Sequence, residues 1–93
     1  MTYTIETTAE FNEWFEDQDD KIKGFVRARL SRIQDAGHFG IVKAVGDGVL
    51  ELKWKNGLRV YFGYLERTRV LILLGGPKNG QNQDIKKAKK IFS

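Results

Sequence analysis

The segment from Val49 to Gly63 alternates apolar and polar residues around an Asn-Gly pair, and this pattern constrains the fold more than any other part of the chain. The apolar positions are Leu50, Leu52 and Trp54 before Asn56-Gly57, and Leu58, Val60 and Phe62 after it. Alternation with a period of two is typical of strands that bury one face. The segment therefore predicts a β-hairpin with one apolar face and one charged face.

The length of the hairpin loop decides which charged residues lie opposite one another. A two-residue Asn-Gly loop would mix the two faces and place cations against the core. A three-residue loop, Lys55-Asn56-Gly57, with Gly57 at positive φ, keeps the faces separate and pairs Trp54 with Leu58. We therefore expect the three-residue loop.

The expected register gathers four polar residues on the face turned away from the core. Lys53 pairs with Arg59 and Glu51 lies opposite Tyr61 in this arrangement. We take this patch as the candidate active surface. The alternative is an ordinary solvated strand face of mixed charge.

The remaining segments predict an α+β fold in a single domain, residues 1–93. Residues 2–6 alternate as a short strand, Thr7 and Glu10 are spaced as a capping box for a helix to about Gln18, and a second helix is expected from Asp19 or Asp20 to Gly37. Strands follow at 41–45 and in the hairpin, and the apolar run 70–74 is expected to be the central strand. A last helix should begin near Gln81. The prediction is an N-terminal strand and a helical hairpin packed on an antiparallel sheet of about four to five strands, with a C-terminal helix.

Charge is distributed unevenly along the chain. The net charge is +4, but residues 1 to 20 hold seven acids and no Lys or Arg, so the other 73 residues carry +11. A basic region of this kind attracts polyanions such as nucleic acid.

Composition excludes several kinds of chemistry. The chain has no Cys and one His, so we expect no metal site, no thiolate nucleophile and no disulfide, and no sequence motif calls for a cofactor. It also lacks an apolar run of membrane-spanning length and a signal-like start, so we expect a cytoplasmic protein without a membrane partner.

The residues of the hairpin suit cleavage of a phosphodiester by its own 2′-hydroxyl, a group that RNA has and DNA lacks. Arg59 and Lys78 can hold the phosphate and offset its developing charge. Lys53 or Glu51 can transfer the proton, and the sequence does not separate these two assignments. Tyr61 can stack on a base or orient a phosphate.

Several motifs together resemble a known family. They are Thr8-Ala9-Glu10-Phe11 with Trp14, the run Val45 to Leu52, Arg59-Val60-Tyr61-Phe62, Leu73 to Lys78, and Gln81 with Asp84-Ile85. This combination is similar to the addiction-module killer proteins, RelE/ParE-superfamily toxins of type II toxin–antitoxin systems related to HigB. The chain departs from the family pattern at Pro77, Asn82 and Gln83.

The resemblance implies a toxin restrained by an antitoxin, here a small helix-turn-helix DNA-binding protein, in a hetero-oligomeric complex. It implies mRNA cleavage at the ribosome, with Lys53, Arg59 and Lys78 in catalysis. Together with the hairpin argument, it gives Glu51 as a fourth catalytic candidate and Tyr61, Lys55 and Gln81 as substrate contacts.

Two alternatives of other classes stay open. The first is a ParE-like inhibitor of DNA gyrase that binds without cutting RNA. The second is a non-catalytic module whose basic surface serves the antitoxin alone.

Overall fold

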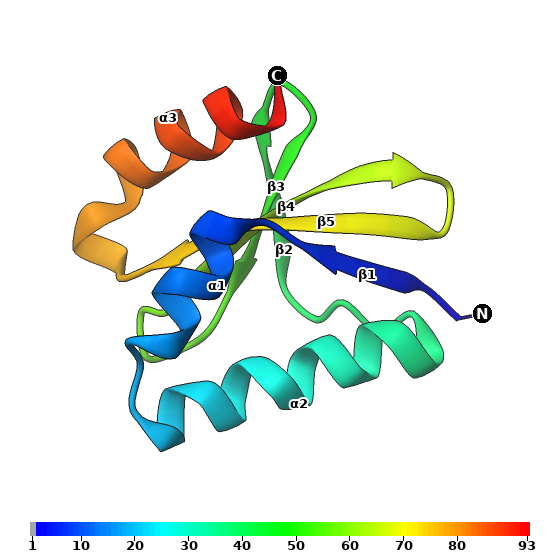
Figure 1. Ribbon diagram of the computed structural model, residues 1–93, viewed down its shortest axis with the longest axis horizontal. Helices are drawn as coiled ribbons and strands as arrows, with labels where there is room; N and C mark the ends of the chain where they lie inside the picture. Colours follow the sequence, from blue (N-terminus) through cyan, green and yellow to red (C-terminus); the bar gives the residue numbers. More distant parts are fainter. Residues whose placement is uncertain (1) are drawn as a thin grey trace.

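The computed structural model describes residues 2–93, and its centre is one five-stranded sheet (Figure 1). The spatial order of the strands is β1-β5-β4-β3-β2. Their bounds are Thr4–Thr7 for β1, Val42–Gly46 for β2, Val49–Lys53 for β3, Arg59–Glu66 for β4 and Arg69–Gly76 for β5. The strands β2 to β5 pair antiparallel, as expected, whereas β1 joins β5 in parallel and makes the sheet mixed.

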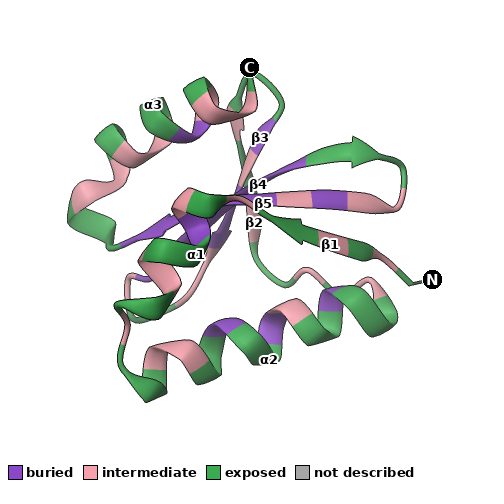
Figure 2. Cartoon of the chain, viewed as in Figure 1, coloured by how far each residue is buried: buried purple, intermediate pink, exposed green. Residues whose placement is uncertain are grey.

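Helices cover both faces of this sheet. The two helices of the expected helical hairpin are α1, Ala9–Glu16, and α2, Asp20–Ala36, and their buried residues share one core with β3, β4 and β5. The C-terminal helix α3, Gln81–Phe92, follows a short 3-10 turn, η1, Lys78–Gly80, and packs on the opposite face. Figure 1 shows α2 below the sheet and α3 above it, and Figure 2 shows that burial is greatest where the strands cross between them.

The helix ends agree with the sequence signals except at the two ends of α1. Thr8, not Thr7, caps α1, and its hydroxyl accepts a hydrogen bond from Phe11 N–H at 3.0 Å. Thr7 is the last residue of β1, where its backbone pairs with Ile72. Asp19 caps α2 through a 2.9 Å bond from Ile22 N–H, and Gly37 ends that helix in the left-handed conformation. Helix α1 ends at Glu16, two residues before the expected end, so these local signals fix the helices to within two residues.

The expectation for the central strand was wrong. The run 70–74 lies in β5, an inner strand flanked by β1 and β4, whereas β4 occupies the centre. The run is apolar on both faces because each face lies under helices: Val70 and Ile72 belong to the core under α1 and α2, and Leu73 and Leu74 belong to the core under α3. Burial on both faces thus does not require the central position in the sheet.

Candidate functional site

The β3–β4 hairpin has the three-residue loop that the sequence predicts. Lys53 pairs with Arg59, and Glu51 pairs with Tyr61. Gly57 has φ of 97°, and its N–H donates to the Trp54 carbonyl at 3.1 Å. The register that brings Lys53 and Arg59 together is therefore confirmed.

The charged face of this hairpin lies against a second core, which corrects our expectation that it is turned away from the core. Glu51 and Tyr61 have no exposed surface, and Arg59 keeps only 6%. The cover is α3, whose apolar side packs on this face with Ala88, Ile85 and Phe92. The apolar stripe of α3 must be buried, and the second face of the sheet is available because α1 and α2 cover the first.

A buried polar cluster lies beneath the start of α3. Arg59 Nε stands 3.7 Å from Glu51 Oε2, within ion-pair distance but beyond a hydrogen bond. Gln81, the first residue of α3, donates its Nε2 to the same oxygen at 2.7 Å. Glu51 therefore connects the hairpin to α3, and Gln81 contacts a predicted catalytic residue.

The cluster keeps hydrogen-bonding groups that its neighbours do not use. Within residues 2–93, Arg59 Nε and the Tyr61 hydroxyl have no hydrogen-bond partner, although Arg59 Nη1 donates to the Leu58 carbonyl at 3.2 Å. Burial, followed by the nearby carboxylates of Glu51 and Asp84, raises the pKa of Tyr61. Tyr61 therefore stays neutral and can donate a hydrogen bond. The sequence analysis did not include Asp84 in this cluster.

Lys53 and Lys55 line a cationic groove on another side of the hairpin. The groove has a volume of about 660 Å³, and its other basic residues are Arg29, Arg32 and His38. Trp54 contributes an aromatic wall. Lysines, arginines and an aromatic ring in one groove form a surface suited to a nucleic-acid backbone.

Arg29 holds this groove together. Its side chain is 9% exposed, and it donates to the carbonyls of Phe39 at 2.8 Å, Ile41 at 2.6 Å and Lys53. The guanidinium carbon also lies 4.3 Å from the ring centre of Trp54. Arg29 thus ties α2 to the end of β3. The sequence analysis missed this residue, although its place between Val26 and Ile33 on the buried stripe of α2 was the available signal.

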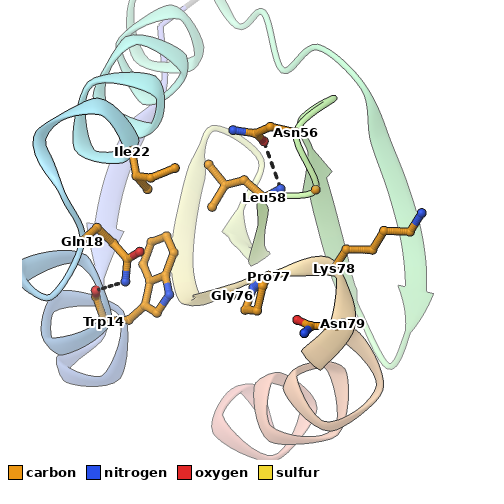
Figure 3. Close-up of a pocket in the computed structure, with 10 residues that line it drawn as sticks. Trp14, Gln18, Ile22, Asn56, Leu58, Gly76, Pro77, Lys78 and Asn79 are labelled. Carbon is orange, nitrogen blue, oxygen red and sulfur yellow. Dashed lines mark hydrogen bonds between the residues drawn. The ribbon is translucent and has the colours of Figure 1, made fainter.

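Lys78 lies on the other side of the hairpin loop. A Cβ at Gly57 would stand 3.4 Å from Lys78 Cβ, so η1 packs directly against the loop. Lys78 is exposed and lines a cleft of about 750 Å³ between the loop and the helices α1 and α2 (Figure 3). The hairpin loop therefore separates Lys78 from the groove that holds Lys53 and Lys55.

The predicted site residues thus fall into three neighbouring sets around one hairpin end. Lys53 and Lys55 line the groove, Lys78 lines the cleft, and the buried cluster holds the others: Glu51, Arg59, Tyr61 and Gln81. Over residues 2–93 no three His, Asp or Glu side chains gather in a way that could hold a metal ion. In the described part of the chain, none of the helices has the length and apolar character that a membrane crossing requires.

Two solved toxin structures share this architecture. One is a mutant of the toxin RelE of Escherichia coli in the free state, with a TM-score of 0.75 over 98% of this chain and 99% of that chain at 13% identity. The other is the toxin–antitoxin complex RelBE2 of Mycobacterium tuberculosis, with a TM-score of 0.66 over 83% of this chain and 99% of that chain at 16% identity. The chain therefore has the fold of the RelE toxins.

Sequence comparison gives the family directly. Residues 13–93 match the family described as phage derived protein Gp49-like (DUF891). An uncharacterized protein of Haemophilus influenzae is 39% identical over 98% of this chain and 94% of its own length. The chain belongs to the Gp49-like family.

Proposed function

We propose that this chain is the toxin of a type II toxin–antitoxin pair and that it cleaves mRNA on the ribosome. The RelE fold and the RelBE2 relative support a toxin with an antitoxin partner. The observation that carries the activity is that four cations, Lys53, Lys55, Arg59 and Lys78, surround one end of the β3–β4 hairpin. A phosphodiester is the substrate that such a cluster suits best.

The reaction is an attack of the ribose 2′-hydroxyl on the adjacent phosphorus. The O2′–P bond forms and the P–O5′ bond breaks, which gives a 2′,3′-cyclic phosphate and a 5′-hydroxyl end. Lys78 and Arg59 hold the phosphate and offset the charge that grows on its oxygens. A second group takes the proton from the 2′-hydroxyl, and a proton is returned to the leaving oxygen.

Burial favours one of the two proton-transfer candidates that the sequence left open. Glu51 has no exposed surface, and its Oε2 already accepts from Gln81 and faces Arg59. Lys53 is half-buried and borders open groove. We therefore assign proton transfer to Lys53 and give Glu51 the role of positioning Arg59 and Gln81.

The remaining predicted contacts keep supporting roles in this proposal. Lys55 is exposed beside Lys53 and binds the backbone phosphates that flank the cut. Gln81 orients Glu51 through its hydrogen bond, and Tyr61 lies beside the same carboxylate with its hydroxyl available as a donor. The partners are then mRNA, the ribosome and an antitoxin of the helix-turn-helix class, and the toxin acts in the cytoplasm, where translation occurs.

The test is a transcriptome-wide map of new RNA 5′ ends after brief induction of the wild type and of variants at matched soluble levels. Lys53→Ala and Lys78→Ala should remove cuts within translated codons, because each loses one charge near the phosphate. Lys21→Ala is the matched control, since Lys21 is an exposed lysine on α2 outside the groove and the cleft.

The contrary outcomes point to the other classes. Growth arrest with DNA breaks and without RNA cuts would replace the nuclease by a ParE-like gyrase inhibitor. Growth without arrest would favour a module that acts only in its antitoxin complex.

A further inference from the structure

The cleft beside Lys78 has the chemistry of a binding site for a flat heterocycle. Its walls are the apolar side chains of Trp14, Ile22, Leu58 and Pro77. Its volume of about 750 Å³ lies within the range of roughly 300–1,000 Å³ typical of small-molecule sites. Figure 3 shows these walls facing one another across the space between α1, α2 and the hairpin loop.

Trp14 is a fixed platform in this cleft. A Cβ at Gly75 would stand 2.4 Å from two atoms of the indole, so the ring lies directly on the backbone of β5. Phe11 supports it with ring centres 5.8 Å apart. Figure 3 shows the indole nitrogen on the side of the ring that faces Gly76 and Pro77. The cleft therefore presents a rigid aromatic surface with an N–H donor at its edge.

Three amide side chains add unused hydrogen-bonding groups around the apolar walls. Gln18 donates its Nε2 to the Trp14 carbonyl at 2.8 Å, which leaves its own carbonyl oxygen as an acceptor. Asn56 accepts from Leu58 N–H at 3.0 Å through Oδ1, which leaves its NH₂ as a donor. Asn79 makes no side-chain hydrogen bond within residues 2–93, so both of its groups stay available.

We propose that this cleft binds a nucleobase of the RNA and thereby sets the base preference of cleavage. Apolar walls for the ring, amide donors and acceptors for its edge, and Lys78 for the attached phosphate match the three parts of a nucleotide. Lys78, which the proposed function places on the scissile phosphate, lines the same cleft, so the base would lie beside the proposed cleavage site. The inference rests on the proposed function for its substrate class.

An apolar side chain of an antitoxin fits the same walls less well. It would cover the Asn79 amide, the Gln18 carbonyl and the Asn56 amide nitrogen without offering them partners. Each buried polar group left unpaired costs about 1–3 kcal/mol. The polar edge therefore favours the base over the protein side chain.

The binding test uses the two tryptophans of the chain as separate probes, Trp14 for the cleft and Trp54 for the groove. In ¹H–¹⁵N spectra, addition of AMP, GMP, CMP or UMP should shift the Trp14 indole signal saturably, together with the Asn79 side-chain amide. The Trp54 indole lies in the other groove, where phosphate binding can shift it, so inorganic phosphate is titrated in parallel and should leave the Trp14 indole in place. A Trp54→Phe sample assigns the two signals.

Two variants test the assignment of groups. Asn79→Ala should weaken the response to at least one of the four nucleotides about five-fold, as expected for one hydrogen bond. Ile22→Phe, which fills the cleft, should abolish the Trp14 shifts. Asn82→Ala is the matched control, because Asn82 is an exposed asparagine on α3 that does not line the cleft.

The 5′-end map separates this inference from the proposed function. Asn79→Ala should change the base preference around the cuts while cutting continues. Unchanged preference together with no Trp14 shift would overturn the inference and leave the nuclease standing. Trp14 shifts without RNA cuts by any variant would keep the nucleotide site and overturn the nuclease, and a Trp14 shift caused by the antitoxin alone would assign the cleft to the protein partner.

Discussion

Replacement of Arg29 by Met should lower the stability of this protein more than any single substitution of an exposed basic residue. The guanidinium donates to three backbone carbonyls from α2, and Met keeps the length of the side chain but donates nothing. Of the three acceptors, the Ile41 carbonyl also receives the Lys53 N–H at 3.2 Å, so it keeps a partner. The carbonyls of Phe39 and Lys53 lose the Arg29 donor.

The expected cost follows from these groups. Two carbonyls that lose a charged donor account for about 1–2 kcal/mol each. The lost contact with Trp54 adds about 1 kcal/mol. Burial, with a further contribution from the charge of Arg32, lowers the pKa of Arg29, which means that the buried charge has a desolvation cost that Met avoids. We therefore expect a net loss of about 3 kcal/mol, a large part of the roughly 5–14 kcal/mol available to a chain of this length.

Urea unfolding followed by far-UV circular dichroism measures this loss as a lower midpoint with an unchanged m-value. Arg29→Lys should lose less, because an ammonium group keeps the charge and some of the bonds. Arg32→Met is the control on the same helix, and its exposed side chain should leave stability within about 0.5 kcal/mol. A midpoint for Arg29→Met equal to that of Arg32→Met would refute the reasoning, since the three carbonyls would then be satisfied without the guanidinium.

Three further changes test other parts of the structure. Burial raises the pKa of Asp84, so the stability that this carboxyl contributes is fully present below its unfolded pKa and is lost as pH rises through its folded pKa. Asp84→Asn should therefore stabilise the protein at pH 7. Urea midpoints should show that this gain in stability shrinks toward pH 3. Thr8→Ala removes both the cap bond from Phe11 N–H and a 2.7 Å bond to the Leu73 carbonyl, and thermal unfolding should show a loss of about 1–2 kcal/mol, whereas an unchanged Tm would mean that water replaces both bonds. Gly63→Ala places a Cβ 2.4 Å from the Phe92 ring and should lower the stability by about 1–3 kcal/mol. Gly24→Ala, at an exposed helix position with nothing within 4 Å, should raise the stability by about 0.5–1 kcal/mol. The opposite order of Tm values would contradict the packing of α3.

The sequence was sufficient for the hairpin because its signals are short-range. Alternating residues define two faces, and only a loop with Gly57 at positive φ keeps those faces separate, so Lys53 had to lie opposite Arg59. The helix starts and the left-handed Gly37 follow from residues a few positions apart. The cap of α1 was placed one residue early because both Thr7 and Thr8 can cap a helix, and pairing of β1 with β5 uses Thr7 in the strand.

The sequence was not sufficient for the surroundings of the site. Lys53 and Lys78 are both basic residues near the hairpin, but the groove with Arg29 and the cleft with Trp14 each require segments that are distant along the chain. Arg29 on the apolar stripe of α2 and Trp14 on α1 are recognisable in the sequence as positions on the core-facing sides of their helices. The sequence does not indicate which loop packs beside each of them. The residues that line the groove and the cleft can therefore be identified only when the positions of the helices are known.

By itself, the sequence determined the elements, the hairpin register and the pairing of Lys53 with Arg59, since these depend on local backbone preference and on the two-residue period of a strand. Only the tertiary structure decided that the charged face of the hairpin is covered, with Glu51 and Tyr61 fully buried. The apolar side of α3 had to leave water, and the second face of the sheet, where Leu73 and Leu74 also required a cover, was where it could pack. Packing between distant segments thus determines which polar side chains remain accessible. The local pattern of residues does not carry this information.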